Sequence, residues 1–338
     1  MRKISFIIPV YNVSAYLKRC LDSIKPFYDD GNEIIIVNDG STDSSDDIIK
    51  EFISSNKGCI YVYQDNAGLS AARNTGLNYA TCNYVWFIDS DDYIDSSNKD
   101  VIYDAINHDY DTIVFGRIEE YENRAICVPR NICNVIYESG IEYFLDSIRV
   151  GSYRTNVWDK IIKRSVLTDN NIHFEEGLLY EDMFFVLQLF VFSRKTLVLP
   201  IYAYHYIKNN PYSITRTIRA NDLDVLIFAK KANVFMHARV PINETNYEFQ
   251  LLMFNWISSC VLNKYAVLSL RDNMAKNIFW KVMKDYYFRK SVIYCSKSGM
   301  LNRSTILAKI LRVNPNLYRY ILILLLNFRR CIIRYGRV

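Results

Sequence analysis

Short apolar runs alternate with helical stretches through the first 115 residues, and this alternation limits the possible folds more than any other feature. Five runs are rich in β-branched and aromatic residues, which is typical of buried strands. Helices between successive strands indicate an α/β protein with one mostly parallel sheet, covered by helices on both faces. The predicted strands are Ile4–Pro9, Glu33–Val37, Cys59–Tyr63, Tyr84–Ile88 and Thr112–Phe115.

Polar clusters follow three of these strands. Tyr11-Asn12 follows the first, Asn38-Asp39-Gly40-Ser41 the second, and Asp89-Ser90-Asp91-Asp92 the fourth. The carboxyl ends of parallel strands share one edge of the sheet, where open α/β proteins bind ligands. Neither a Gly-x-Gly-x-x-Gly motif nor a P-loop follows the first strand, which argues against a dinucleotide dehydrogenase and a P-loop nucleoside triphosphatase.

The acidic cluster places Asp89, Asp91 and Asp92 within four positions. Such close carboxylates repel one another unless a cation or an unusual environment compensates them. Mg²⁺ and Mn²⁺ take oxygen ligands, usually one or two carboxylates together with substrate phosphates. The alternative is a solvated acidic turn that caps the helix predicted to start near Ser96.

Two further residues suit a nucleotide ligand. Asp39 can accept from a base N–H or a ribose hydroxyl, while Gly40 permits close approach of the backbone. Arg73, in the first turn of the predicted helix Leu69–Tyr79, is suited to a phosphate beside free backbone N–H groups. The alternatives are that Asp39-Gly40-Ser41 forms only a turn and that Arg73 is an exposed helix charge.

Charge is unevenly distributed along the chain. No Asp or Glu follows Asp285, whereas eleven Lys or Arg lie between Arg289 and Arg337. Thirty of the 41 bases therefore precede residue 289 with all 36 acids, so residues 1–288 carry about −6. A basic tail on an acidic body favours an anionic partner, a membrane surface or a nucleic acid. No nucleic-acid-reading motif accompanies the tail, so we expect no nucleic-acid partner.

Cysteine usage and the N-terminus indicate a cytosolic protein. The eight cysteines include no Cys-x-x-Cys pair, and the four histidines lack metal-binding spacing, which favours reduced thiols over disulfides or zinc. The apolar run Ile4–Val10 is interrupted by Pro9 and followed by no small-residue cleavage site, which predicts a strand rather than a signal peptide.

Four blocks in the first third, taken together, resemble the family 2 glycosyltransferases. The match covers roughly residues 3–115 in order and spacing. The family consists of inverting, nucleotide-sugar-dependent enzymes with the GT-A fold. The resemblance therefore implies a Rossmann-like sheet and a metal-dependent transferase using Mn²⁺ or Mg²⁺. The blocks are Ile4–Asn12, Ile36–Asp43, Asn66–Gly76 and Phe87–Asp92.

The resemblance also implies roles for single residues. Pro9, Tyr11 and Asp39 line the nucleoside pocket, with Asp39 facing the base. Arg73 contacts the nucleotide. Asp89-Ser90-Asp91 is the Asp-x-Asp element, with Asp89 near the ribose and Asp91 on the metal that bridges the diphosphate. Asp89 and Asp91 are thus the candidate metal ligands, while Ser90 is counted among the nucleotide contacts.

The second part of the domain carries two weaker resemblances. Val157–Arg164 resembles the Trp-x-Lys-Leu segment of bacterial members, with Asp159 where Asn is usual. Leu178–Phe185 resembles the Glu-Asp motif, which makes Asp182 the catalytic base, with Glu181 orienting it or holding the acceptor. The alternative is that both are first-turn acids favoured by the helix dipole. His205 is expected to be a hydrogen-bonded core histidine, with a metal or diphosphate contact as the other possibility.

We therefore predict a GT-A domain at 1–216, with a nucleotide-sugar-binding half at 1–115 and an acceptor half at 116–216. The Gln-x-x-Arg-Trp signature of processive synthases is absent, which favours single-sugar addition. A UDP-sugar donor and a lipid-linked saccharide acceptor, as in capsule assembly, are expected from family habit. The alternatives are a non-catalytic sugar-nucleotide binder or scaffold, and a nucleotidyltransferase.

A helical region is predicted over 217–338. The apolar run in its last helix is about eight residues, whereas a membrane span needs about twenty. A basic, aromatic and apolar helix suits the interface of an anionic leaflet, which places the protein at the inner face of the cell membrane. The alternative is a core-packing or homodimer-forming helix. The predicted helices are Leu223–Phe235, Tyr247–Leu268, Asn273–Phe288, Ser304–Val313 and Leu317–Arg334.

Overall fold

The computed structural model describes most of the chain and divides it into two compact units. The first comprises Met1–Ser147 and Ser152–Thr217, and the second Ile148–Gly151 and Ile218–Val338. The described residues are 3–28, 31–129, 132–208, 220–240, 242–270, 272–299 and 302–324.

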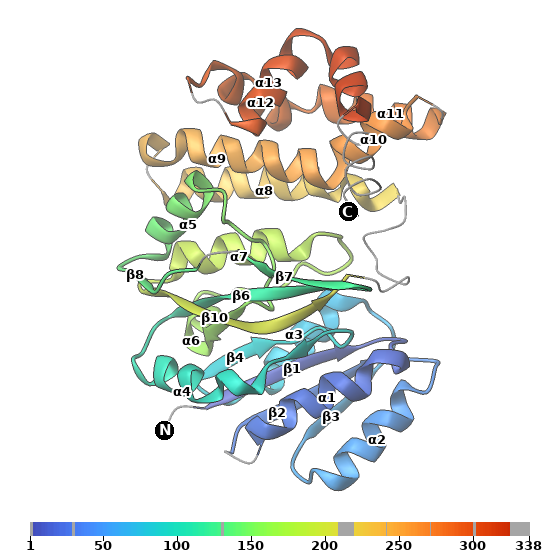
Figure 1. The fold of residues 1–338 in the computed structure, drawn as a ribbon, viewed down its shortest axis with the longest axis vertical. Helices are drawn as coiled ribbons and strands as arrows, with labels where there is room; N and C mark the ends of the chain where they lie inside the picture. Colours follow the sequence, from blue (N-terminus) through green and yellow to red (C-terminus); the bar gives the residue numbers. More distant parts are fainter. Residues whose placement is uncertain are drawn as a thin grey trace. The chain divides into compact units, whose positions relative to one another are not determined.

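The first unit is built on a ten-stranded mixed sheet with the order β3-β2-β1-β4-β9-β6-β10-β5, to which β7 and β8 are added on β6 and β10 (Figure 1). Its strands are β1 Ile4–Val10, β2 Glu33–Asp39, β3 Ile60–Gln64, β4 Tyr84–Phe87, β5 Tyr93–Ile94, β6 Thr112–Tyr121, β7 Arg124–Val128, β8 Val135–Tyr137, β9 Lys160–Lys163 and β10 Thr196–Ile207.

Strands β3, β2, β1 and β4 are all parallel, as are β6 and β10. Strand β9 lies antiparallel between β4 and β6. The predicted mostly parallel sheet is therefore confirmed. The β–α alternation did not indicate β9 or the other antiparallel strands, which are β5 and β8 on β10 and β7 on β6. The fifth predicted strand is longer than expected, because β6 runs on beyond Phe115 to Tyr121.

Helices cover both faces of the sheet. Helices α1, α2 and α4 pack on the face that carries Phe6, Ile34 and Trp86, where the rings of Phe6 and Trp86 lie 5.7 Å apart. Helix α3 packs on the opposite face so closely that a Cβ on Gly76 would lie 2.3 Å from Ile7 Cγ2. Glycine is therefore required there. The helical elements of this part are α1 Ser14–Tyr28, α2 Ser45–Ser55, α3 Leu69–Tyr79, η1 Ser96–Asn98, α4 Lys99–Asn107, α5 Gly140–Arg149, α6 Arg164–Asp169 and α7 Glu181–Phe192.

The second unit is helical. Its elements are η3 Ala220–Leu223, α8 Asp224–Arg239, α9 Ile242–Ile257, the π-helical turn η4 Ser258–Leu262, α10 Asn263–Leu268, α11 Asn273–Lys284, α12 Tyr286–Lys297, α13 Arg303–Val313 and a helix at 315–324.

Two predicted helices of this unit differ in detail from expectation. The predicted helix Asn273–Phe288 is two helices, because Asp285 caps α12 by accepting from the N–H of Phe288 at 2.9 Å. The predicted helix Tyr247–Leu268 begins earlier, at Ile242, and contains the π-helical turn η4 between α9 and α10. The stretch Tyr247–Leu268 is long and apolar enough to cross a membrane, but 61% of its most apolar window is buried inside the structure, as in a core helix. The last predicted helix, Leu317–Arg334, lies outside the described residues beyond Leu324.

Candidate active site

The parallel register brings the predicted ligand residues to one edge of the sheet. Val10 pairs with Asn38, and Ile7 pairs with Phe87, so the chain leaves β1, β2 and β4 on the same side. Tyr11, just beyond β1, is 51% exposed, while Pro9 is buried within β1. The exposed ring of Tyr11 is suited to stacking on a nucleobase, and the contacts of Pro9 and Tyr11 with a nucleoside stay predictions.

Asp39 joins the end of β2 to the start of α3. Its Oδ1 accepts from Gln64 Nε2 at 2.7 Å and from the N–H of Ala67 at 2.9 Å, and its Oδ2 accepts from the N–H of Gly68 at 2.9 Å. The side chain is buried, so Asp39-Gly40-Ser41 is more than a solvent-exposed turn. The contact of Asp39 with a base stays a prediction.

The acidic cluster after β4 is not a solvated cap. That function belongs to Asp95, whose side chain accepts from the N–H of Ser97. Asp89 is partly buried and forms an ion pair, while Ser90 and Asp92 are buried. Asp89 and Asp92 are therefore held in different environments, and one role does not cover both.

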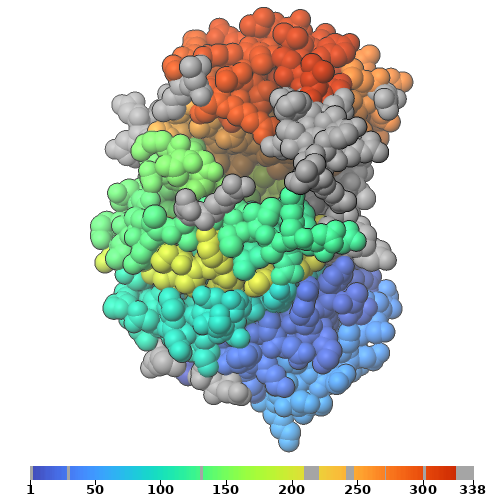
Figure 2. Space-filling model, viewed as in Figure 1, coloured from blue at the N-terminus to red at the C-terminus, as the bar shows by residue number. Residues whose placement is uncertain are grey.

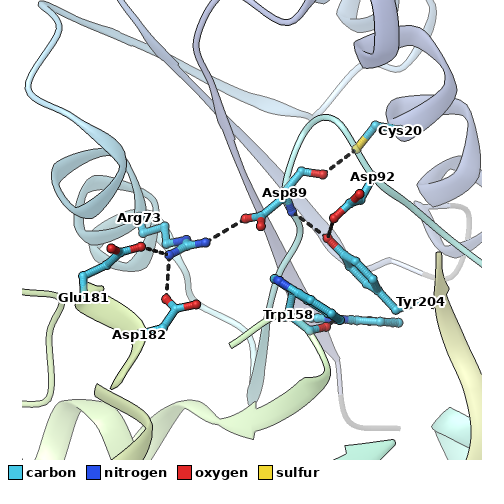
Figure 3. Close-up of polar contacts among 9 residues, drawn as sticks. Cys20, Arg73, Asp89, Asp92, Trp158, Glu181, Asp182 and Tyr204 are labelled. Atoms are coloured by element: carbon cyan, nitrogen blue, oxygen red, sulfur yellow. Dashed lines mark hydrogen bonds and ion pairs between the residues drawn. The ribbon is translucent and has the colours of Figure 1, made fainter. Parts of the chain in front are cut away.

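Asp92 is held by β10. Its Oδ2 accepts from Tyr204 Oη at 2.9 Å, and its Oδ1 accepts from the N–H of Ile207 at 2.8 Å. Tyr204 Oη also accepts from the N–H of Asp89 at 3.1 Å, and its ring stacks on Trp158 at 4.3 Å (Figure 3). Burial, and then the charges of Asp91 and Asp89, raise the pKa of Asp92 well above its ordinary value. Asp92 thus supports the loop that presents Asp89 and Asp91.

Arg73 connects the acidic cluster to the start of α7. Its Nη2 donates to Asp89 Oδ1 at 2.7 Å, and its Nη1 donates to Glu181 Oε1 at 2.8 Å and Asp182 Oδ1 at 2.7 Å. In Figure 3 the guanidinium lies between these two groups of carboxylates. Arg73 is the fifth residue of α3 and is 1% exposed, so it is not a surface charge. Its contact with a nucleotide stays a prediction.

Asp182 and Glu181 open α7, next to a strained residue. Tyr180, the N-cap, has φ of +67°, a left-handed conformation that is uncommon outside glycine. Burial raises the pKa of Asp182 to about 7, against the opposing charge of Arg73 and with further increases from Glu181 and Asp89. A carboxylate with a pKa near neutrality is suited to accept a proton at physiological pH.

Lys160 and Tyr204 interact with the candidate site, and the sequence assigned neither of them a role. Lys160 is fully buried, pairs with Asp159 and donates to the carbonyl of Arg154 at 3.4 Å. Its charge also lowers the pKa of Asp182. The signals available in the sequence were the charged pair inside the apolar run Val157–Ile162 and the aromatic alternation along β10.

His205 is hydrogen-bonded, as expected for a structural histidine. Its Nδ1 lies 2.8 Å from Glu120 Oε1, and its ring stacks on Tyr93 at 4.2 Å. Glu120 also accepts a hydrogen bond from the hydroxyl of Tyr93. These contacts account for one ring nitrogen and one ring face.

The carboxylates after β4 are of the ligand type that hard divalent cations such as Mg²⁺ prefer. Asp89 and Asp91 supply oxygen donors at the ligand edge, whereas both oxygens of Asp92 accept hydrogen bonds from β10. Over the described residues, no group of three or more His, Cys, Asp or Glu side chains is gathered as a ready-made metal site. A Mg²⁺ site takes one or two carboxylates and completes its shell with phosphates, so Asp89 and Asp91 stay predicted metal ligands.

Comparison with known proteins identifies the domain. Residues 5–160 match the family model described as glycosyl transferase family 2. Glycosyltransferase GlyA of Streptococcus pneumoniae serotype 4 is 36% identical over 218 residues, covering 62% of this chain and 31% of GlyA. EpsH of Bacillus subtilis strain 168 is 27% identical over 272 residues, covering 79% of each protein. The chain thus matches less than a third of GlyA but most of EpsH.

The fold has a solved counterpart. The crystal structure of Staphylococcus aureus TarS 1–349 in complex with UDP-GlcNAc matches with a TM-score of 0.72 and 19% identity, over 94% of this chain and 89% of that chain. This likeness concerns the fold, and it confirms the predicted GT-A sheet followed by a helical region. Residues 5–160 therefore form a domain of the family 2 glycosyltransferases.

Proposed function

We propose that the protein is an inverting glycosyltransferase that moves one sugar from a UDP-sugar to a hydroxyl of a saccharide acceptor. The bridge through Arg73 carries this proposal, because it holds Asp89, on the donor side, and Asp182, the base, at the same guanidinium. Donor and acceptor groups then meet at one place, which transfer between them requires.

The reaction needs one base. The acceptor hydroxyl gives its proton to the Asp182 carboxylate as its oxygen bonds to the anomeric carbon. The bond from that carbon to the diphosphate oxygen breaks at the same time, and its electron pair leaves with the nucleoside diphosphate. Attack opposite the leaving group inverts the anomeric carbon. Glu181, on the same Arg73 nitrogen, orients Asp182 through their shared partner.

Asp89 and Asp91 would hold a Mg²⁺ or Mn²⁺ ion. When bound there, the ion neutralises charge that develops on the leaving diphosphate. Arg73 forms an ion pair with Asp89 Oδ1 at 2.7 Å and so compensates the negative charge of this carboxylate. Tyr204 fixes the backbone N–H of Asp89 and thereby the direction of its side chain.

Two observations support a uridine donor and a polysaccharide pathway. TarS, the structural counterpart, is known in complex with UDP-GlcNAc. TarS is a poly(ribitol-phosphate) beta-N-acetylglucosaminyltransferase, and its sequence is 30% identical to this chain over 215 aligned residues. We extend this to a lipid-linked saccharide acceptor at the inner face of the cell membrane. The competing function is a non-catalytic sugar-nucleotide binder or scaffold, which would need no base at position 182.

A nucleotide-sugar screen tests the donor. UDP-sugars with Mn²⁺ are expected to raise the melting temperature, since a ligand that binds only the folded state stabilises it by mass action. Slow donor hydrolysis should accompany binding. Asp91→Ala is expected to remove both effects of Mn²⁺, whereas Asp104→Ala, at an exposed carboxylate of α4, should keep them. Binding without hydrolysis or transfer to any acceptor would favour the non-catalytic alternative.

The pH dependence tests the base. Because Asp182 acts deprotonated, kcat/KM is expected to fall about tenfold per pH unit below its pKa of about 7 and to level off above it. The negative charge of Glu181 raises this pKa, so Glu181→Gln should move the acid limb to lower pH. Rate profiles of the two proteins provide the measurement. An acid limb that Glu181→Gln leaves in place would contradict the assignment.

A further inference from the structure

The segment 286–324 of the helical unit combines positive charge with exposed apolar side chains. It contains seven Lys or Arg and no Asp or Glu. Its elements are α12, α13 and the helix at 315–324. In Figure 2 this part of the chain forms the red end of the colour scale and presents a broad surface to solvent.

Helix α13 buries one face and exposes an apolar stripe on the other. Leu307 and Leu311 are buried, whereas Ile306 and Val313 are exposed, with 82% of Val313 accessible. Residues 306 and 313 are seven positions apart, or two helical turns, so both lie on the same side. Arg303 and Lys309 flank this stripe. The solvent side of α13 is therefore apolar in the middle and basic at its borders.

The helix at 315–324 repeats the pattern. Tyr318 and Leu322 are buried, while Leu317, Tyr320 and Leu324 are exposed, with 67% of Leu324 accessible. The exposed residues recur at intervals of three and four, which defines one helical face. Single exposed apolar residues need no explanation on a protein surface, but two successive helices with such stripes and no acid do.

Helix α12 shows the same arrangement, with a buried face and exposed apolar side chains on the other side. Its buried side chains include Phe288 and Cys295, and its exposed side chains include Tyr286 and Ile293, seven positions apart. Lys297 lies on this exposed side, four positions after Ile293. Tyrosine and lysine are residues that place a polar end in water and an apolar stem in a membrane interface.

We infer that the exposed faces of α12, α13 and the helix at 315–324 form a membrane-docking surface for anionic phospholipid. Apolar side chains with basic borders are the arrangement by which a helix lies in the headgroup region. Each Lys or Arg near an anionic leaflet adds attraction. The inference rests on the proposed location at the membrane and is independent of sugar transfer.

The charge of the segment 286–324 favours anionic lipid over a second copy of the chain or a nucleic acid as the partner of this surface. In a symmetric dimer this surface would meet its own copy, and a segment without acids offers no counter-charge to its own bases. Nucleic acid would satisfy the bases, but phosphates give no partner to Ile306, Val313 or Leu324. An anionic leaflet supplies both the negative charge and an apolar layer.

Vesicle sedimentation of the full chain tests the surface. The protein should pellet with vesicles of phosphatidylcholine and phosphatidylglycerol, and much less with phosphatidylcholine alone. The double variant Ile306→Asp and Val313→Asp is expected to lower the partition coefficient at least about tenfold. The matched control Val234→Asp, at an exposed valine of α8, should leave it unchanged. Salt at about 0.5 M should weaken binding by screening the charges.

Three results would overturn the inference: no sedimentation of the wild-type chain, equal loss in the Val234→Asp control, or equal binding to neutral and anionic vesicles. A concentration-dependent dimer in light scattering that the double variant dissociates would assign the surface to a second copy and also overturn it. Donor hydrolysis without vesicles, measured on the same preparations, separates this outcome from failure of the proposed reaction.

Discussion

Replacement of Asp182 by Asn is expected to lower kcat about 10²–10⁴-fold, the loss typical of removing a general base. Asparagine has nearly the same shape and can still accept from Arg73 Nη1, which now lies 2.7 Å from Asp182 Oδ1. It cannot take the proton of an acceptor hydroxyl. Single-turnover rates with donor and acceptor provide the measurement, and donor binding by thermal shift should change little.

A control variant separates this role from a helix-dipole effect. Asp182 lies in the first turn of α7, where any acid stabilises the helix by about 0.3–1 kcal/mol. Asp100 occupies the first turn of α4 and is exposed. Asp100→Asn should therefore remove the same kind of helix-dipole interaction with no loss of rate. If the two variants were equally active, Asp182 would be only a first-turn acid.

Replacement of Arg73 by Gln is expected to destabilise the first unit by about 3–5 kcal/mol, the cost of removing one partner from a buried ion pair. Burial alone would lower the pKa of Arg73, yet the charges of Asp182, Asp89 and Glu181 raise it above its ordinary value. Without the guanidinium, these three carboxylates would repel one another at close range. Hydrogen exchange of the β1 and β4 amides would report on this unit alone.

Two comparisons make the Arg73 result interpretable. Lys18→Gln removes an exposed ion pair with Asp22 on α1 of the same unit and should cost less than about 1 kcal/mol. The double variant Arg73→Gln and Asp182→Asn should lose less stability than the sum of the two single variants, because one of the repelling charges is then absent. A destabilisation by Arg73→Gln as small as that of Lys18→Gln would show that the bridge contributes little.

Arg73 has one further property that links stability to function. Its Nε is buried and has no hydrogen-bond partner among the residues that the structure describes. The guanidinium carbon lies 5.1 Å from the ring centroid of Phe174, which partly compensates the charge. An unsatisfied buried donor costs about 1–3 kcal/mol. Such a cost is tolerated where geometry serves the site, since three hydrogen bonds from Nη1 and Nη2 hold the carboxylates in place.

The local sequence pattern was sufficient to predict the parallel half of the sheet. The apolar runs at β1, β2 and β4 are buried on both faces, so their sequences carry the strand signal without reference to distant partners. Helix α3 was predicted with its observed bounds, Leu69–Tyr79. The ligand edge followed from these elements, because parallel strands must end on the same side of the sheet.

The pairing of strands that lie far apart in the sequence could not be predicted from the local sequence pattern. Nothing in the four residues of β9 indicates that they lie antiparallel between β4 and β6. The same holds for β10, which pairs with β6 across more than seventy residues of chain. Strand register depends on which apolar faces meet, and several partners would satisfy a run such as Leu197–Leu199 equally well.

The sequence by itself determined the α/β class and the edge of the sheet at which the polar and acidic clusters lie, because strand periodicity and motif spacing are local properties. Only the tertiary structure decided that Arg73, on α3, is buried between Asp89 and Asp182, residues more than ninety positions apart. A guanidinium is solvated or buried according to what packs over it. For Arg73 that is α7, whose position is set by long-range packing of Phe185 against Phe87.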